Sequence, residues 1–218
     1  MQRLFLFVAA ALGLTTTAAS AGTLNYTSYG VTNAQNVHIT DPALGVNNEY
    51  GGAGQIVLYN GSTPVFEAWC VDIQDWLSVS GTYTTGSSPS SAGLSPPADR
   101  EIGALIYAYN TNASVNSVYN ASAAIQLAIW QIDYGSGLLL NPDNSALTAL
   151  ADQYVADVSP GGSWTLPSNW DLDILYANIP GHQGNQNLAY VTDVPVAEPG
   201  TLMLWLTGLA ALRRRPVA

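Results

Sequence analysis

A single cysteine and one glutamine are the residues of this chain best suited to covalent chemistry. Cys70 is the only cysteine among the 218 residues, so it cannot form a disulfide within the chain. An unpaired cysteine in a secreted protein indicates either pairing with another molecule or a free reactive thiol. A glutamine that the fold places beside the cysteine would allow a third outcome, because a thiol that displaces ammonia from a carboxamide leaves an internal thioester. Gln126, in the apolar segment 124–130, is the candidate partner.

The residues beside this pair carry a family resemblance. Trp69-Cys70-Val71 and, later, Gln126-Leu127-Ala128-Ile129-Trp130 resemble the thioester domain of bacterial surface adhesins. That family pairs an aromatic or Leu before the cysteine and an aliphatic residue after it with a later Gln-x-Ala-[Ile/Val]-Trp segment. The resemblance covers about residues 65–134 and implies a Cys70–Gln126 cross-link. It also implies a thioester pocket formed by Trp69, Val71, Ala128, Ile129 and Trp130. The chain departs from the family at Ile125, where a threonine is usual.

A structural role for both residues is the alternative. Cys70 can serve as a small buried hydrophobe, and Gln126 as a core amide whose hydrogen bonds are satisfied. A buried amide without partners costs about 1–3 kcal/mol, so Gln126 needs partners in either case. For the reactive alternative we expect Gln126 at the base of a groove walled by Trp69 and Trp130, with the helices between Cys70 and Gln126 adding to the wall. Such walls exclude water and slow hydrolysis.

Other constellations in the sequence are weaker. His38 and His182 are the only histidines, and Cys70 with His182 is conceivable as a nucleophile and base. Nothing around Cys70 resembles a cysteine-protease motif, so we expect no enzyme activity. The histidines and cysteine lack the local spacing of metal ligands, so we expect no metal and no cofactor. Trp164 and Trp170 are candidates for a sugar-binding platform, although core packing is the commoner use of tryptophan.

The elements that must position the pair begin with a predicted hairpin. Residues 23–66 have the character of β-structure, with a strand at 55–59, a turn at Asn60-Gly61 and a second strand at 65–73. In the second strand, alternation places Cys70 and Asp72 on one face and Trp69 and Val71 on the other. Residues 80–97, rich in Gly, Ser, Thr and Pro, predict a long loop.

Helices are predicted after this loop. Apolar periodicity predicts helices at about 98–110, 121–133 and 145–158, with a polar linker at 110–120. The second helix is apolar on nearly every side and carries Gln126. Residues 172–176 and 188–192 return to strand. The prediction is an α+β domain over residues 22–194, an antiparallel β-sheet or sandwich with an inserted helical subdomain of about three helices.

The first 21 residues have the features of a secretory signal peptide. Arg3 supplies the positive region, residues 4–14 the apolar core, and Ala19-Ser20-Ala21 a small-residue cleavage site. The alternative is an N-terminal membrane helix, but the apolar run is shorter than the roughly 20 residues that span a bilayer. We therefore expect the protein to be exported.

The C-terminal residues 195–218 resemble the PEP-CTERM sorting tail of Gram-negative bacteria. Three features carry this resemblance, namely a Pro-Glu-Pro-like motif, an uncharged stretch at 202–212 and a basic cluster. The sorting residues are Glu198, Pro199, Gly200, Thr201, Arg213, Arg214 and Arg215. Ala197 stands where the family has its first proline. The resemblance implies recognition by an exosortase and the secretion machinery, with transient insertion of the tail into the inner membrane and the arginines on the cytoplasmic side. A buried or amphipathic C-terminal helix is the alternative.

The charge distribution limits the partners. The chain has a formal net charge of −10 and no lysine, and between the two ends Arg100 is the only arginine. Nucleic acid is therefore an unsuitable partner, because phosphate binding needs a basic surface. A surface without lysine also protects a thioester from attack by its own chain, although compositional drift explains the same observation. We expect an exported cell-surface or extracellular-matrix protein that attaches covalently to an amine or hydroxyl nucleophile. The alternative is a structural protein associated with exopolysaccharide or biofilm.

Overall fold

The computed structural model describes residues 21–177 and 185–194. Its strands form one antiparallel sheet of eight, in the order β1-β5-β7-β8-β4-β3-β2-β6. The strands are β1 (Thr23–Tyr26), β2 (Ser28–Asp41), β3 (Val46–Asn60), β4 (Thr63–Cys70), β5 (Gly81–Ser87), β6 (Leu139–Pro142), β7 (Trp170–Tyr176) and β8 (Leu188–Asp193). The helices are α1 (Ala98–Thr111), α2 (Ala113–Asn116), α3 (Ala121–Tyr134) and α4 (Ala146–Val158), with short 3-10 turns η1 (Pro89–Ala92) and η2 (Gly135–Gly137). The α+β prediction is confirmed.

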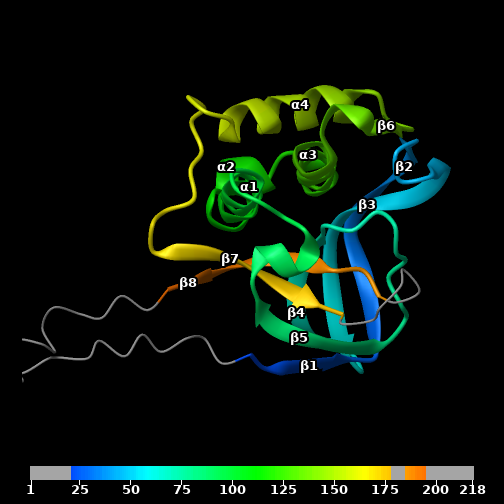
Figure 1. Ribbon diagram of the computed structural model, residues 1–218, viewed down its shortest axis with the longest axis vertical. Coiled ribbons are helices and arrows are strands. Elements are labelled where there is room, and N and C mark those ends of the chain that lie inside the picture. The colour runs from blue at the N-terminus through cyan, green and yellow to red at the C-terminus, as the bar shows by residue number, and fades with distance from the viewer. Residues whose placement is uncertain (1–20, 178–184, 195–218) are drawn as a thin grey trace, which may run out of the picture.

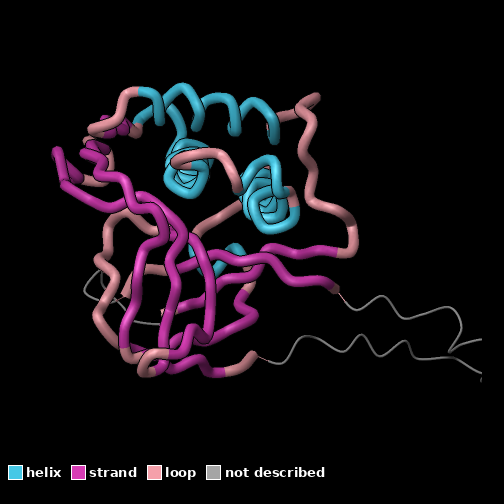
Figure 2. Tube along the Cα trace, turned by 180° about the vertical axis from the view of Figure 1, so that it is seen from behind, coloured by secondary structure: helices cyan, strands magenta, loops and turns pink. Residues whose placement is uncertain are grey.

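The four helices of the described residues lie on one side of the sheet (Figure 1). In the sequence they all fall between β5 and β7. α1 and α3 lie nearest the strands, and α4 crosses above them on the side away from the sheet. The view from behind shows the same layering (Figure 2). Because α3 lies between the sheet and α4, it is buried over its first ten residues, from Ala121 to Trp130. Its Ala, Ile and Leu composition suits this position.

The predicted β3–β4 hairpin is confirmed. Asn60 pairs with Thr63 across the turn, and Gly61 has a φ of 62°, in the left-handed region that glycine enters without strain. The second strand, however, ends at Cys70 rather than at residue 73. Beyond it the chain turns, since both the amide and the carbonyl of Asp72 contact Cys70 Sγ.

Several short elements were missed by the sequence analysis. The predicted loop at 80–97 contains β5 and η1, the linker at 110–120 contains α2, and β6 was not predicted at all. β5 is polar, and in it only Tyr83 is buried. It is a strand because β1 and β7 pair with it on either side. Such long-range pairing leaves no mark in local composition.

The two ends of the chain are outside this description. The predicted signal peptide, apart from Ala21, and the predicted sorting tail at 195–218 lie outside the described residues, as does His182. Within residues 21–177 and 185–194, no helix combines the length and apolar character needed to cross a membrane.

Candidate thioester site

The structure brings Cys70 and Gln126 into direct contact. The Cys70 amide donates to Gln126 Oε1 at 3.0 Å, and Gln126 Nε2 donates to the Cys70 carbonyl at 2.7 Å. Gln126 is 1% exposed and Cys70 3%. Both hydrogen-bonding ends of the carboxamide are therefore held by the backbone of the cysteine, 56 positions earlier in the chain.

The carboxamide replaces a missing strand partner. Pairing between β3 and β4 runs from Asn60–Thr63 to Ile56–Ala68 and stops one ladder step before Cys70. In that register, Gly54 of β3 would lie opposite Cys70. In antiparallel sheets, alternate residues direct their N–H and C=O to the same neighbouring strand. Those groups of Cys70 would face Gly54 if β3 stayed paired with β4, and they face Gln126 instead.

A serine one turn earlier on α3 explains why β3 turns away. Ser122 Oγ accepts from the Gln55 amide at 2.7 Å and donates to the Thr32 carbonyl at 2.9 Å. It thereby joins α3 to β2 and β3, where their register shifts between Thr32 and Gln35. A Cβ on Gly54 would lie 2.8 Å from Thr32 O, so no larger residue fits there. The Ser122 contacts fix the position of α3 against the sheet, and Gln126 is then opposite the end of β4.

The Cys70 sulfur is held in a tight turn by the backbone of Asp72. Sγ donates to the Asp72 carbonyl at 3.0 Å and accepts from the Asp72 amide at 3.3 Å. The Tyr134 hydroxyl, from the last turn of α3, accepts from the Ile73 amide at 3.2 Å and donates to the Val71 carbonyl at 3.3 Å. The segment after Cys70 is thus tied to the same helix that carries Gln126.

Burial controls the ionisation of the groups around the sulfur. Burial raises the pKa of the Cys70 thiol to about 12, so the thiol is neutral at physiological pH. Hydrogen bonding to Asp72 lowers that pKa, but by less. Burial also raises the pKa of Asp133 to about 7, and the charge of Asp72 adds to this effect. The site therefore contains a protonated thiol and a carboxyl that titrates near neutrality.

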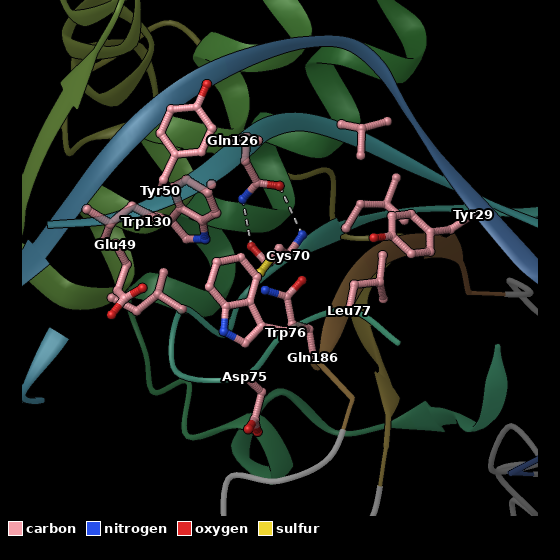
Figure 3. A pocket seen from close by; sticks show the side chains of 16 residues that line it. Tyr29, Glu49, Tyr50, Cys70, Asp75, Trp76, Leu77, Gln126, Trp130 and Gln186 are labelled. Atoms are coloured by element: carbon pink, nitrogen blue, oxygen red, sulfur yellow. Dashed lines mark hydrogen bonds between the residues drawn. The ribbon is translucent and has the colours of Figure 1, made fainter. Parts of the chain in front are cut away.

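The pair lies at the base of a cavity of about 270 Å³ (Figure 3). Its walls come from β2, from β3, from the loop after β4 and from α3. The aromatic lining residues are Tyr29, Tyr50, Trp76 and Trp130, and the polar ones besides the pair are Glu49, Asp75 and Gln186. Trp76 and Tyr50 are 63% and 51% exposed, whereas Cys70 and Gln126 are almost fully buried. The exposed aromatic residues form the mouth of the cavity.

The predicted pocket residues do not all line this cavity. Trp130 does. Trp69 lies in β4 but outside the lining, with its ring edge-on to Tyr109 of α1 at 5.0 Å, so the expectation that Trp69 walls the groove is wrong. The reason is the alternation of β4, which directs Trp69 and Cys70 to opposite faces. Val71, Ala128 and Ile129 are buried nearby without lining the cavity.

The expected contribution of the inserted helices is also wrong in part. No lining residue comes from α1 or α2, and the walls are instead made by the long β2–β3 hairpin and by residues 73–77. The aromatic residues of the mouth were missed by the sequence analysis. One local feature of the sequence pointed to them. Trp76 follows a short polar segment with two aspartates and a glutamine, and such a segment is unsuited to the core.

The weaker candidates take other positions. His38 approaches Asp143 at 4.0 Å and packs edge-on to Tyr50. Trp164 and Trp170 are half-buried and pack against Tyr154 and Tyr107, respectively. Among residues 21–177 and 185–194, no cluster of three or more His, Cys, Asp or Glu side chains is arranged to bind a metal.

The chain matches no protein-family model, no curated protein and no solved structure. The interpretation of the Cys70–Gln126 site therefore depends on its geometry and on the sequence motif.

Asp133 makes stability depend on pH in a direction that can be tested. Its pKa in the folded state is about 7, above the ordinary carboxyl value. Protonation of Asp133 therefore contributes stability that is complete below about pH 4 and is lost as the pH rises through 7. We expect Asp133→Asn to match the wild type at pH 4 and to be more stable at pH 8 by about 1 kcal/mol, since partial exposure screens the effect.

The measurement is thermal unfolding of both proteins at pH 4 and pH 8. Asp171→Asn, which removes an exposed carboxylate, is the control and should show no such difference between the two pH values. An Asp133→Asn variant that is less stable than the wild type at pH 8 would contradict this account.

Proposed function

We propose that Cys70 and Gln126 form an internal thioester, and that the protein uses it to attach covalently to an amine or hydroxyl of a surface or matrix partner. The observation that carries the proposal is the pair of hydrogen bonds between the Gln126 carboxamide and the Cys70 backbone at the base of a cavity. Holding nucleophile and electrophile together in this way lowers the barrier to their reaction by several kcal/mol.

The arrangement suits formation of the bond. The Cys70 sulfur attacks Gln126 Cδ, the Cδ–Nε2 bond breaks, and the thiol proton leaves with the nitrogen as ammonia. The Cys70 amide, 3.0 Å from Oε1, donates to the oxygen on which negative charge develops. The reaction needs no oxidant and no water, and its product is a Sγ–Cδ thioester with one ammonia released.

The cavity suits the second step. A partner amine or hydroxyl that reaches Cδ forms an amide or ester, and the Cδ–S bond breaks to regenerate the Cys70 thiol. The aromatic residues at the mouth restrict the approach of water, which would hydrolyse the thioester unproductively. Because the chain has no lysine, it lacks the side-chain amine most able to consume the bond within or between its own molecules.

A purely structural role is the second candidate, and one observation favours it. Both ends of the Gln126 carboxamide are hydrogen-bonded, so this buried amide is already satisfied without covalent chemistry. In that case Gln126 is a non-covalent link between α3 and β4, and the protein is a structural component of a matrix.

The cellular setting is part of the same proposal. A signal peptide at residues 1–21 and a sorting tail at 195–218 would export the chain and present it to an exosortase, with the tail inserted transiently in the inner membrane. The mature protein would then reside at the cell surface or in the extracellular matrix. In either candidate function it is not an enzyme.

Intact-mass spectrometry of freshly purified protein tests the proposal directly. We expect a mass one ammonia below the value calculated for the sequence, and a methylamine adduct at Gln126 after incubation with that amine. Cys70→Ala should have its full calculated mass and take up no methylamine. A wild-type protein of full mass whose Cys70 is freely alkylated in the native state would rule out the thioester and leave the structural role.

A further inference from the structure

We propose that the indole N–H of Trp130 is a hydrogen-bond donor to the Cys70 sulfur when that sulfur carries negative charge, and so stabilises it as nucleophile and as leaving group. The inference rests on the proposed thioester, and it assigns to Trp130 a chemical role beyond that of an apolar wall.

The first observation is an unpaired buried donor. Trp130 is 3% exposed, and its Nε1 has no hydrogen-bond acceptor among the residues that the structure describes. Leaving a buried N–H unpaired costs about 1–3 kcal/mol, and most buried donors in proteins are satisfied. Trp130 also lines the cavity at whose base Cys70 lies. The indole is thus an unused donor beside the reacting atoms.

The second observation is the position of Trp130 on α3. It follows Gln126 by four residues, so the carboxamide and the indole project from the same face of the helix. Figure 3 shows the indole nitrogen of Trp130 on the side of the ring that faces Cys70. Trp130 acts to lower the pKa of the Cys70 thiol, against the larger effect of burial, although its Nε1 makes no hydrogen bond of ordinary geometry to the neutral sulfur.

The neutral thiol is already hydrogen-bonded without the Trp130 donor. Its proton is directed to the Asp72 carbonyl, and its sulfur already accepts from the Asp72 amide. A thiolate has no proton to donate and accepts more strongly. The carboxyl groups whose charges act on the sulfur are those of Asp72 and Asp133. The hydroxyls of Tyr83 and Tyr134 also interact electrostatically with Cys70. None of these four supplies positive charge, so the stabilising partners of a thiolate here are N–H donors.

Negative charge reaches the sulfur in both steps. During formation the thiol loses its proton to the departing nitrogen, the Sγ–Cδ bond forms and the Cδ–Nε2 bond breaks. During transfer a partner amine attacks Cδ, the Cδ–Sγ bond breaks with its electron pair going to Sγ, and a proton from the amine ends on the sulfur. A donor placed on the sulfur lowers the pKa of the thiol and makes it a better leaving group.

The test separates the donor from the bulk of the side chain. Trp130→Phe removes the N–H, and Trp69→Phe is the matched control, because Trp69 is equally buried and adjacent to Cys70 but lies outside the cavity lining. We expect Trp130→Phe to slow methylamine uptake by the full-length protein about tenfold, while Trp69→Phe changes the rate little.

A second measurement reports the ionisation of the Cys70 thiol in a protein that cannot form the thioester. In a Gln126→Ala background, where the bond cannot form, the rate of alkylation of Cys70 by iodoacetamide is followed against pH. We expect Trp130→Phe to shift this profile upward by about one pH unit, which is a tenfold loss of thiolate at a given pH. If Trp130→Phe fails to fold, a benzothienylalanine at position 130 keeps the shape of the ring and replaces the N–H with sulfur.

The outcomes separate this inference from the proposed function. If the wild type has the full mass calculated from its sequence, the thioester is contradicted, but the alkylation profile still tests whether Trp130 donates to the sulfur. An alkylation profile that is the same in the presence and absence of the Trp130 N–H overturns the donor, even when the thioester forms. Equal slowing by Trp130→Phe and Trp69→Phe also overturns it, since that result reflects loss of packing alone.

Discussion

Gln126→Ala is expected to abolish both the loss of ammonia and every amine adduct, and to destabilise the protein as well. The variant lacks the electrophilic carbon, so no thioester can form. Even where no thioester has formed, it leaves the Cys70 amide and carbonyl without partners in a buried position, because the pairing of β3 with β4 ends before them. Two buried backbone groups left unpaired cost about 2–6 kcal/mol in the free energy of unfolding.

The two effects can be measured separately. Intact mass and methylamine uptake report the bond, and denaturant unfolding in a Cys70→Ser background, which cannot form the thioester, reports the hydrogen bonds alone. Gln131→Ala is the matched control. Gln131 is also on α3, but its amide donates to Asp152 on the exposed side of the helix. We expect this control to keep the mass loss and nearly all of the stability.

The structural alternative predicts a different pattern for the same variant. If Gln126 only links α3 to β4, Gln126→Ala loses these hydrogen bonds but no cross-link, and the wild type has its full mass and takes up no amine. A Gln126→Ala protein as stable as the wild type would contradict both candidate functions, since both depend on the contact with Cys70.

Cleavage of the thioester by methylamine is expected to lower the melting temperature of the wild type by about 10 °C. The bond closes a loop between positions that are 56 residues apart. A covalent link across a loop of this length restricts the unfolded chain, as a disulfide does, and the same loop-entropy relation gives a stabilisation of about 4 kcal/mol. For a domain of this size, 1 kcal/mol corresponds to a shift of about 2–4 °C.

Calorimetry of the same protein sample before and after methylamine treatment makes the comparison without any substitution. Cys70→Ser treated in the same way is the control and should show no shift. If the treated wild type carries the adduct but melts at an unchanged temperature, the cross-link does not stabilise the fold by this mechanism. A thioester that resists every amine until the protein unfolds would show that the bond is an internal cross-link and not an anchor.

The sequence by itself determined the elements on which the pair lies. The alternation after Asn60-Gly61 predicts a strand containing Cys70, and the apolar character of residues 121–133 predicts a buried helix containing Gln126. Both depend on local periodicity, which survives without knowledge of the partners of each element. The motif also selected the two residues that the fold brings into contact.

Only the tertiary structure decided how the two residues meet. β3 separates from β4 just before Cys70, and this separation depends on Ser122 and Gly54, which are distant from Cys70 in the chain. No local sequence pattern therefore predicts that the Cys70 backbone is left for the Gln126 amide to bind. The exposed aromatic mouth and the exclusion of Trp69 from the cavity were likewise decided by packing. Periodicity specifies which face of a strand or helix a residue occupies, but the neighbour opposite that face is specified by long-range contacts alone.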